Sequence, residues 1–203
     1  MLKFSKKDRD LIEPVIGLAR KRKVRLYLVG GALRDLILGR IKENPDFDFA
    51  IKKGAINFGR ALSKELGCGF VLLDKEHGSC RVVRKLKNKI CTYDFTDFRA
   101  VNIEDDLLHR DFTINSIALE DRYILVGKDL SACLIDPYGS RLDIKARIVK
   151  PVSNLSFKED PLRILRAFSF ASMLKFEIHP SVFKLIAPVK NKLKNVSGER
   201  IRD

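Results

Sequence analysis

The chain has 203 residues, of which 45% are hydrophobic, and its 40 basic and 26 acidic residues give a formal net charge of +14 at pH 7. This length and apolar content allow a buried core and exclude a disordered basic tail, while the charge favours a polyanionic partner, either nucleic acid or an acidic lipid surface. No apolar run approaches the roughly 20 residues of a membrane span, and the first residues lack a signal-peptide pattern, so we expect a cytoplasmic protein with no membrane partner.

The chain up to about residue 145 mixes predicted helices and strands, which indicates an α/β (α+β) fold. Apolar residues at helical spacing cover 11–18, with Pro14 expected near the start of that helix. A strand over 24–29 runs into two glycines, and a short helix over 32–38 follows. The next predicted elements are a strand over 46–51, a helix over 58–66, and strands over 69–73, 80–83 and 90–98.

Beyond residue 145 the predicted elements are helical. Residues 151–158 have the composition of a linker, and a strong helix is expected over 159–174, with Pro161 in its first turn, where proline is tolerated. Residues 181–186 and 190–196 continue with helical patterns.

The four cysteines form no C-x-x-C pair, and no histidine stands at zinc-ligand spacing. We therefore expect reduced, mostly buried thiols, as is typical of a cytosolic protein.

Two aspartates, Asp46 and Asp48, lie two positions apart on the strand predicted over 46–51. Side chains at this spacing point to the same face of a strand, so the two carboxylates converge. A divalent cation relieves their repulsion, and oxygen ligands suit Mg²⁺. On its own, a D-x-D pattern is more commonly a solvated strand face. Asp94, on a later strand, is a candidate third carboxylate, and a solvent-facing aspartate is an equal alternative there.

A double glycine, Gly30-Gly31, precedes the aspartates and is followed by Arg34. Glycines between a strand and a helix expose backbone N–H groups that bind anions, and the arginine fork is suited to phosphate. A simple tight turn is the commoner explanation of such glycines alone. A phosphate cradle followed by a carboxylate dyad indicates phosphoryl or nucleotidyl transfer.

A third polar segment contains Arg110, Asp111 and Asn115. On a helix, Asp111 and Asn115 are four positions apart and share a face, where they suit ribose hydroxyls while Arg110 suits a phosphate. The alternative is that Asp111 is simply a helix N-cap.

A fourth segment contains Glu159, Asp160, Arg163 and Arg166. Glu159, Arg163 and Arg166 follow the i, i+4, i+7 spacing of one helix face, and Asp160 stands three positions before Arg163. The alternative is a surface salt-bridge face worth about 0.5 kcal/mol per pair.

The order of these motifs is similar to that of class II tRNA nucleotidyltransferases and bacterial poly(A) polymerases: Gly-Gly-x-x-Arg-Asp, then D-x-D, then Arg-Asp-Phe-Thr-x-Asn, then Glu-Asp-x-x-Arg, over nearly the whole chain. The resemblance implies a polymerase-β-like nucleotidyltransferase head with a small mixed sheet over 1–145, followed by the N-terminal part of an all-helical neck over 146–203. Residues 197–203 look like the start of a neck helix, so the family's body and tail domains are expected to be absent from this chain.

The resemblance also implies a role for each motif. Asp46 and Asp48 would bind two Mg²⁺ ions, with Asp94 as a further catalytic candidate, and the 3′ end of tRNA would be the acceptor. Glu159, Asp160 and Arg163 would act as an amino-acid template for the base of CTP, with ATP as the alternative. The residues implied in nucleotide binding are Gly30, Gly31, Arg34, Arg110, Asp111, Asn115, Asp160, Arg163 and Arg166.

The sequence departs from the family pattern at three places. His109 and Ser169 replace arginines that are usual in the family, and only residues 100–103 separate Arg99 from Glu104. CCA-adding and A-adding members usually carry a longer flexible loop there, whereas enzymes that add only two cytidines lack it, and a short connection cannot easily reshape a pocket from CTP to ATP.

We therefore predict addition of two CMP residues to tRNA from CTP, with release of pyrophosphate. The alternatives are CCA addition, A addition or poly(A) synthesis and, in a different class, a non-catalytic basic RNA-binding module.

Overall fold

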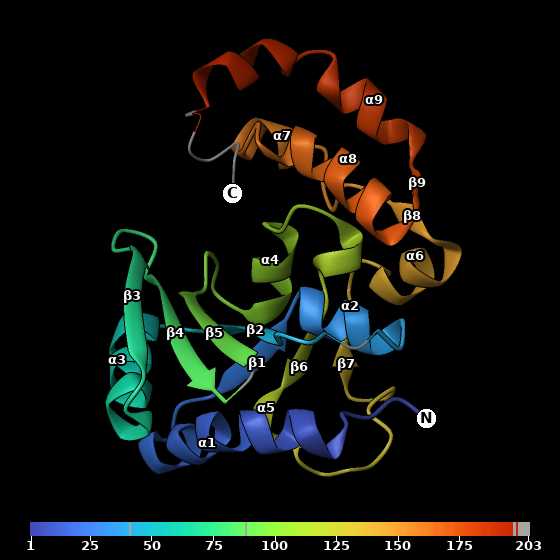
Figure 1. The fold of residues 1–203 in the computed structure, drawn as a ribbon. Helices are drawn as coiled ribbons and strands as arrows, with labels where there is room; N and C mark the ends of the chain where they lie inside the picture. The colour runs from blue at the N-terminus through green and yellow to red at the C-terminus, as the bar shows by residue number, and fades with distance from the viewer. Residues whose placement is uncertain (41, 88, 197, 199–203) are drawn as a thin grey trace.

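The computed structural model describes residues 1–40, 42–87, 89–196 and 198. A seven-stranded mixed sheet forms one part of the molecule, and an arc of helices lies above it (Figure 1). The strands of the sheet are β1 (Leu26–Val29), β2 (Asp46–Ile51), β3 (Gly69–Asp74), β4 (Ser79–Leu86), β5 (Lys89–Asp97), β6 (Ala118–Glu120) and β7 (Leu134–Ile135). Their order is β3-β4-β5-β2-β1-β6-β7, in which β2 and β5 pair parallel and the remaining neighbours pair antiparallel.

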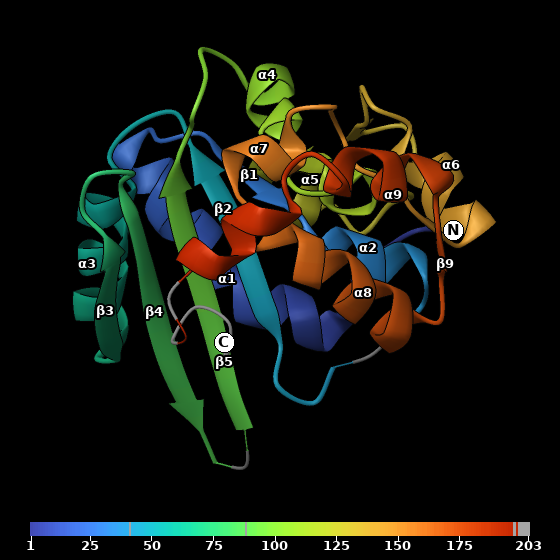
Figure 2. The same cartoon turned by 90° about the horizontal axis from the view of Figure 1, so that it is seen from above.

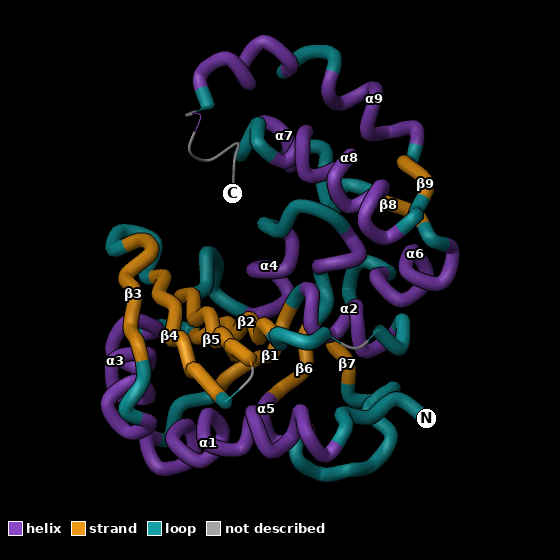
Figure 3. Tube along the Cα trace, in the orientation of Figure 1, coloured by secondary structure: helices purple, strands orange, loops and turns teal. Residues whose placement is uncertain are grey.

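Helices surround this sheet on both faces. The long helices α1 (Lys6–Arg22) and α3 (Ala55–Leu66) pack on the face that carries the core, and the short helix α5 (Asp121–Ile124) lies beside α1 there (Figures 1 and 3). The other short elements connect the strands on the opposite side: α2 (Gly31–Ile37), α4 (Ile103–Leu108), the 3₁₀ turn η1 (Thr113–Asn115) and α6 (Ser140–Ala146). No helix in the described residues is long and apolar enough to span a bilayer.

The two-residue period of β2 and β5 divides their side chains between core and cavity. Phe47 and Phe49 are buried against Tyr93 and Phe95, with ring centroids 6.1 and 5.5 Å apart in stacked pairs. The residues between them therefore project from the opposite face of the sheet. This burial confirms the strand over 46–51 and the mixed fold that the sequence predicts.

The arc of helices has its own core. Its elements are β8 (Ile148–Val149), α7 (Ser156–Glu159), α8 (Arg163–Leu174), β9 (Glu177–Ile178), α9 (Pro180–Ile186) and the 3₁₀ segment η2 (Lys190–Asn195). Seen from above, α8 crosses over α2 (Figure 2). Phe157, Ile164 and Val182 are buried here, together with Phe112 and Ile114 from the sheet-bearing part. The short parallel pairing of β8 with β9 is an element that the helical sequence patterns do not predict.

Three local expectations are wrong. The helix expected over 159–174 is interrupted, because Asp160 is extended (φ −146°, ψ 106°) ahead of Pro161, whose ring disfavours helical geometry in the preceding residue. Pro14 lies in the middle of α1 rather than near its start, since the helix already begins after Ser5, whose side chain accepts a hydrogen bond from the Asp8 N–H.

The third correction concerns residues 111–115, which do not form an α-helix. Phe112 is extended (φ −130°, ψ 152°), and only the 3₁₀ turn η1 follows it. Asp111 is therefore neither on a helix face nor a helix N-cap. The neck helix expected over 197–203 lies, apart from Gly198, outside the described residues.

The four cysteines are free thiols, and Cys80 on β4 packs tightly against α3. A Cβ atom added at Gly59 of α3 would overlap the Cys80 sulfur and lie 3.5 Å from carbons of Phe70 and Phe95. At Gly17 of α1, in contrast, an added Cβ meets nothing within 4 Å. The two helical glycines thus differ in the space around them.

This difference predicts opposite effects of the same substitution. Gly17→Ala should raise the free energy of unfolding by up to about 1 kcal/mol, because alanine is the better helix former. Gly59→Ala should lower it by about 1–3 kcal/mol, because the added methyl group displaces buried atoms. Urea denaturation of both variants measures this. Cys80→Ala should reduce the cost of Gly59→Ala, and equal effects at the two glycines would contradict the packing described.

Candidate active site

A cavity of about 1160 Å³ lies between the open face of the sheet and the helical arc. Its walls come from the β1–α2 turn, β2, the segment 106–115 and the residues that begin α8. Polar residues predominate near the sheet, whereas the opposite wall combines the apolar Leu162, Phe170 and Met173 with charged residues of the segment 159–166. The cavity thus gathers all four motifs of the sequence around one space.

Three carboxylates meet at the sheet side of this cavity. Asp46 and Asp48 project from β2, and Asp94 projects from β5, where it lies directly beside Asp48 in the parallel register. One oxygen from each of the three lies within 4.8 Å of the others. The convergence of Asp46 with Asp48 follows from their spacing, whereas the arrival of Asp94 depends on the register of the sheet.

Each carboxylate has a different environment. Asp46 accepts a hydrogen bond of 2.5 Å from the Thr92 hydroxyl, and both oxygens of Asp94 accept from Arg81 at 2.7 Å. Burial at the cavity floor, reinforced by the charge of Asp46, raises the pKa of Asp48 to about 6. Thr92 and Arg81 were not expected from the sequence. Thr92 could have been found from its alternation with Asp94 on β5, whereas Arg81 lies beside Asp94 only because β4 pairs with β5.

This donor set fits a divalent cation. All three groups offer carboxylate oxygens, which Mg²⁺ prefers, and burial together with the neighbouring charge of Asp46 raises the pKa of Asp48. A cation bound between them would replace repulsion with attraction.

The glycine turn brings backbone close to this cluster. Gly30 has φ +70°, and a Cβ there would lie 3.3 Å from Arg110 Nη1 and 3.4 Å from an Asp48 oxygen. The absence of a side chain therefore allows the carboxylate and the guanidinium to approach the turn together. Arg110 also has a buried Nε without a hydrogen-bond partner among the described residues, and its Nη2 is 3.8 Å from Asp106. Arg110 thus lines the cavity and retains a buried donor that no described residue satisfies.

Arg34 lines the cavity but is held by its neighbours. Its Nε and Nη2 donate to Asp35, and its Nη1 donates to Asn115 at 2.7 Å. Asp35 also forms an ion pair with Lys42, which reaches the cavity from the loop before β2. Lys42 is a further basic residue of the cavity that the sequence motifs did not predict, because it lies in a loop without a recognisable pattern.

Asp111 joins the two parts of the molecule. Its Oδ1 accepts from Asn115 at 3.0 Å, and its Oδ2 accepts from Arg166 of α8 at 2.9 and 2.7 Å. Burial alone would raise the pKa of Asp111, but Arg166, Asn115 and the Phe112 N–H together hold it below its usual value. The predicted pairing of Asp111 with Asn115 is therefore present, although η1 rather than an α-helix produces it.

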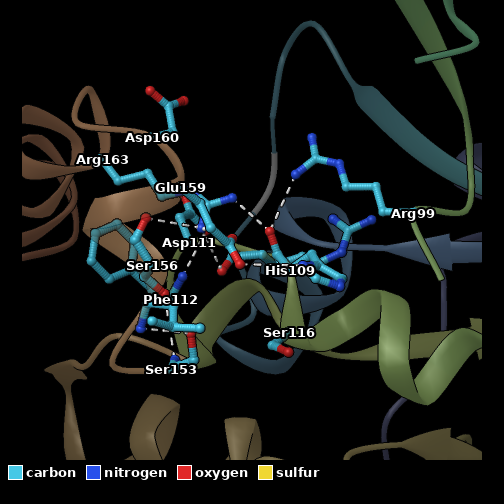
Figure 4. Close-up of polar contacts among 12 residues, drawn as sticks. Arg99, His109, Asp111, Phe112, Ser116, Ser153, Ser156, Glu159, Asp160 and Arg163 are labelled. Carbon is cyan, nitrogen blue, oxygen red and sulfur yellow. Dashed lines mark hydrogen bonds and ion pairs between the residues drawn. The ribbon is translucent and has the colours of Figure 1, made fainter. Parts of the chain in front are cut away.

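The fourth motif is divided by the break at Asp160. Glu159 and Arg163 pair at 3.1 Å, and Arg163 extends to the backbone, donating to the carbonyls of His109 at 2.6 Å and Ser156 at 3.2 Å. Figure 4 shows this reach, with the carboxylate of Asp160 directed away from the other labelled side chains. Arg163 is buried, and its hydrogen bond to the His109 carbonyl connects the helical arc to the sheet-bearing part of the molecule.

The departures from the family pattern have local partners. His109 Nδ1 lies 3.3 Å from Glu159, and Ser169 Oγ donates to the Leu165 carbonyl within α8. The connection after Arg99 is short, because Asn102 caps α4 by accepting a hydrogen bond from the Asp105 N–H. Few residues are thus left between β5 and α4.

Comparison with known proteins agrees with this site. Residues 26–150 match the family described as the poly A polymerase head domain. The chain is 38% identical over 189 residues to a CC-adding tRNA nucleotidyltransferase of Geobacter sulfurreducens, across 93% of this chain and 41% of that protein. It is 33% identical over 178 residues to an A-adding tRNA nucleotidyltransferase of Aquifex aeolicus, across 83% of this chain and 21% of that protein.

Among solved structures, the chain is similar to the CCA-adding enzyme of Thermotoga maritima complexed with tRNA, with a TM-score of 0.78 and 29% identity across 98% of this chain and 46% of that one. The chain therefore spans less than half the length of each of these relatives. Because the family match covers more than half of the chain and the motifs meet in one cavity, the chain belongs to the poly A polymerase head domain family.

Proposed function

We propose that this chain is the catalytic head and the beginning of the neck of a tRNA nucleotidyltransferase, with the division near residues 145 and 146. The observation that carries the proposal is the convergence of Asp46, Asp48 and Asp94 beside the Gly30 turn. The partners proposed are the 3′ end of tRNA and a nucleoside triphosphate, and the location proposed is the cytoplasm. The charge of +14 suits both polyanionic partners.

Asp46 and Asp48 would hold two Mg²⁺ ions, with Asp94 beside them. The ions supply activation of an RNA 3′-hydroxyl and stabilisation of charge on the α-phosphate during in-line displacement of pyrophosphate. Arg110 meets the triphosphate with the donor capacity that it leaves unused in the described structure. Gly30 leaves room for the phosphates to approach the backbone, with Gly31 at the first turn of α2.

The base of the nucleoside triphosphate would be recognised at the cavity wall that faces the carboxylate cluster, where the helical arc begins. Asp160 and Arg163 would face its Watson–Crick edge, with Glu159 holding Arg163. Arg34, Asn115, Asp111 and Arg166 form a hydrogen-bonded series from α2 to α8, which places this wall relative to the carboxylates. In this proposal they act on the sugar and phosphates from fixed positions.

The proposed specificity is CC addition from CTP. The short connection over 100–103 leads straight into the capped helix α4, so it offers little length for reshaping the cavity between nucleotides. The similarity to a CC-adding relative supports the same choice. An A-adding relative is nearly as similar, which makes A or CCA addition the competing activity.

The nucleotide specificity has a direct test. The chain is incubated with Mg²⁺ and a tRNA lacking its terminal nucleotides, first with each labelled nucleoside triphosphate separately and then with CTP and labelled ATP together, and the products are resolved on a sequencing gel. We expect two CMP additions and no extension by AMP. A product extended by AMP after the two cytidines would overturn CC specificity while leaving nucleotidyl transfer intact.

The carboxylate cluster has a second test. Asp48→Asn should lower CMP transfer by more than about a hundredfold, because it removes a stabilisation of several kcal/mol by the metal ions. Filter binding should show tRNA affinity close to that of the unchanged chain, because that affinity comes from basic residues. Asp10→Asn, at an exposed position of α1, is the matched control and should keep full activity. Full activity in Asp48→Asn would favour the non-catalytic RNA-binding alternative.

A further inference from the structure

Arg81 lies beside the carboxylate cluster and has no role in the function proposed above. In the sheet register, Arg81 of β4 stands next to Asp94 of β5, which stands next to Asp48 of β2. Paired residues of neighbouring strands share a face, so all three side chains project from the face of the sheet on which Asp48 lines the cavity. The sheet therefore places a guanidinium in the same row as two carboxylates of the cluster.

The contact between Arg81 and Asp94 uses both carboxylate oxygens. Arg81 Nε donates to Oδ1 and Nη2 donates to Oδ2, each at 2.7 Å. Such a bidentate, charge-assisted pair is among the stronger polar contacts in proteins. In the described part of the chain, Asp94 is the only one of the three cluster carboxylates that takes part in a salt bridge.

The two partners differ in exposure. The side chain of Asp94 is 15% exposed, whereas that of Arg81 is 41% exposed. Asp94 is thus largely removed from water and needs a counter-charge, while Arg81 has room on its solvent side to move away. A cation bound at the cluster would be repelled by the guanidinium and would compete with it for the same oxygens.

We propose that Arg81 is a positioning residue that competes with divalent cations for Asp94, which rests on the function proposed above. Arg81 neutralises Asp94 in the metal-free protein and lowers the affinity of the cluster for a cation bound alone. The negative charge of a bound nucleoside triphosphate offsets this effect. Metal ions therefore bind tightly only together with the nucleotide.

The test measures Mn²⁺ binding to the 203-residue chain by electron paramagnetic resonance, with and without CTP. Without CTP, Arg81→Met should bind Mn²⁺ about tenfold more tightly than the unchanged chain, because a nearby positive charge is removed. With CTP the difference should shrink. Lys85→Met is the matched control, because Lys85 is an exposed cation on the same face of β4, and it should leave Mn²⁺ affinity unchanged.

Further variants test whether Arg81 affects Mn²⁺ affinity through its contact with Asp94. Adding Asp94→Asn to Arg81→Met should abolish the gain in affinity. Arg81→Lys keeps a charge but cannot bridge both oxygens in the same way, so its gain should be smaller than that of Arg81→Met. Thermal unfolding of each variant reports whether the fold is retained. If Arg81→Met unfolds, the Mn²⁺ affinity of Arg81→Lys is compared with that of the unchanged chain instead.

The outcomes separate this inference from the function on which it rests. Mn²⁺ binding that Asp48→Asn does not weaken would overturn the metal site and this inference together. Binding that Asp48→Asn weakens, but that the Arg81 variants leave equal to or weaker than in the unchanged chain, would overturn the inference alone.

Discussion

The parallel pairing of β2 with β5 is the constraint on which the rest of the structure depends. Its register places Asp94 beside Asp48 on one face and Phe95 beside Phe49 on the other. Three carboxylates held within 4.8 Å repel one another, and this repulsion favours separation of the strands. The stacked, buried rings beneath them oppose that separation, since truncating even one such ring typically costs about 3–5 kcal/mol. The core and the charged cluster are thus two faces of the same pair of strands.

A second constraint joins the sheet to the helical arc. Arg34, Asn115, Asp111 and Arg166 form an unbroken series of hydrogen bonds, and the Phe170 ring lies 5.4 and 5.0 Å from the guanidinium carbons of Arg34 and Arg166. Buried polar groups of this kind are costly unless every member is satisfied, so the network favours one relative position of the two parts. The distance across the cavity is set by the same side chains that line it.

The sequence predicts those features that depend on local spacing. The alternation from Asp46 to Phe49 is enough to predict both the strand and the convergence of two carboxylates, because the strand period is local. The approach of Asp94 and Arg81 could not be predicted in the same way, since it depends on strand order between distant segments. The break at Asp160 had a local signal in Pro161, but the apolar periodicity on either side favoured a continuous helix. The roles of individual site residues, and the boundary near residue 145, remain predictions.

The second core has a consequence for how the molecule can be divided. Phe112, Ile114 and Ile144 come from the sheet-bearing part, yet they are buried against Phe157, Ile164 and other residues of the arc. A chain cut after residue 145 would leave these three side chains facing water as a contiguous apolar patch, and such patches promote self-association. The sheet-bearing part is therefore expected to self-associate when it is isolated. Its solubility is supplied in part by a segment that follows it in the chain.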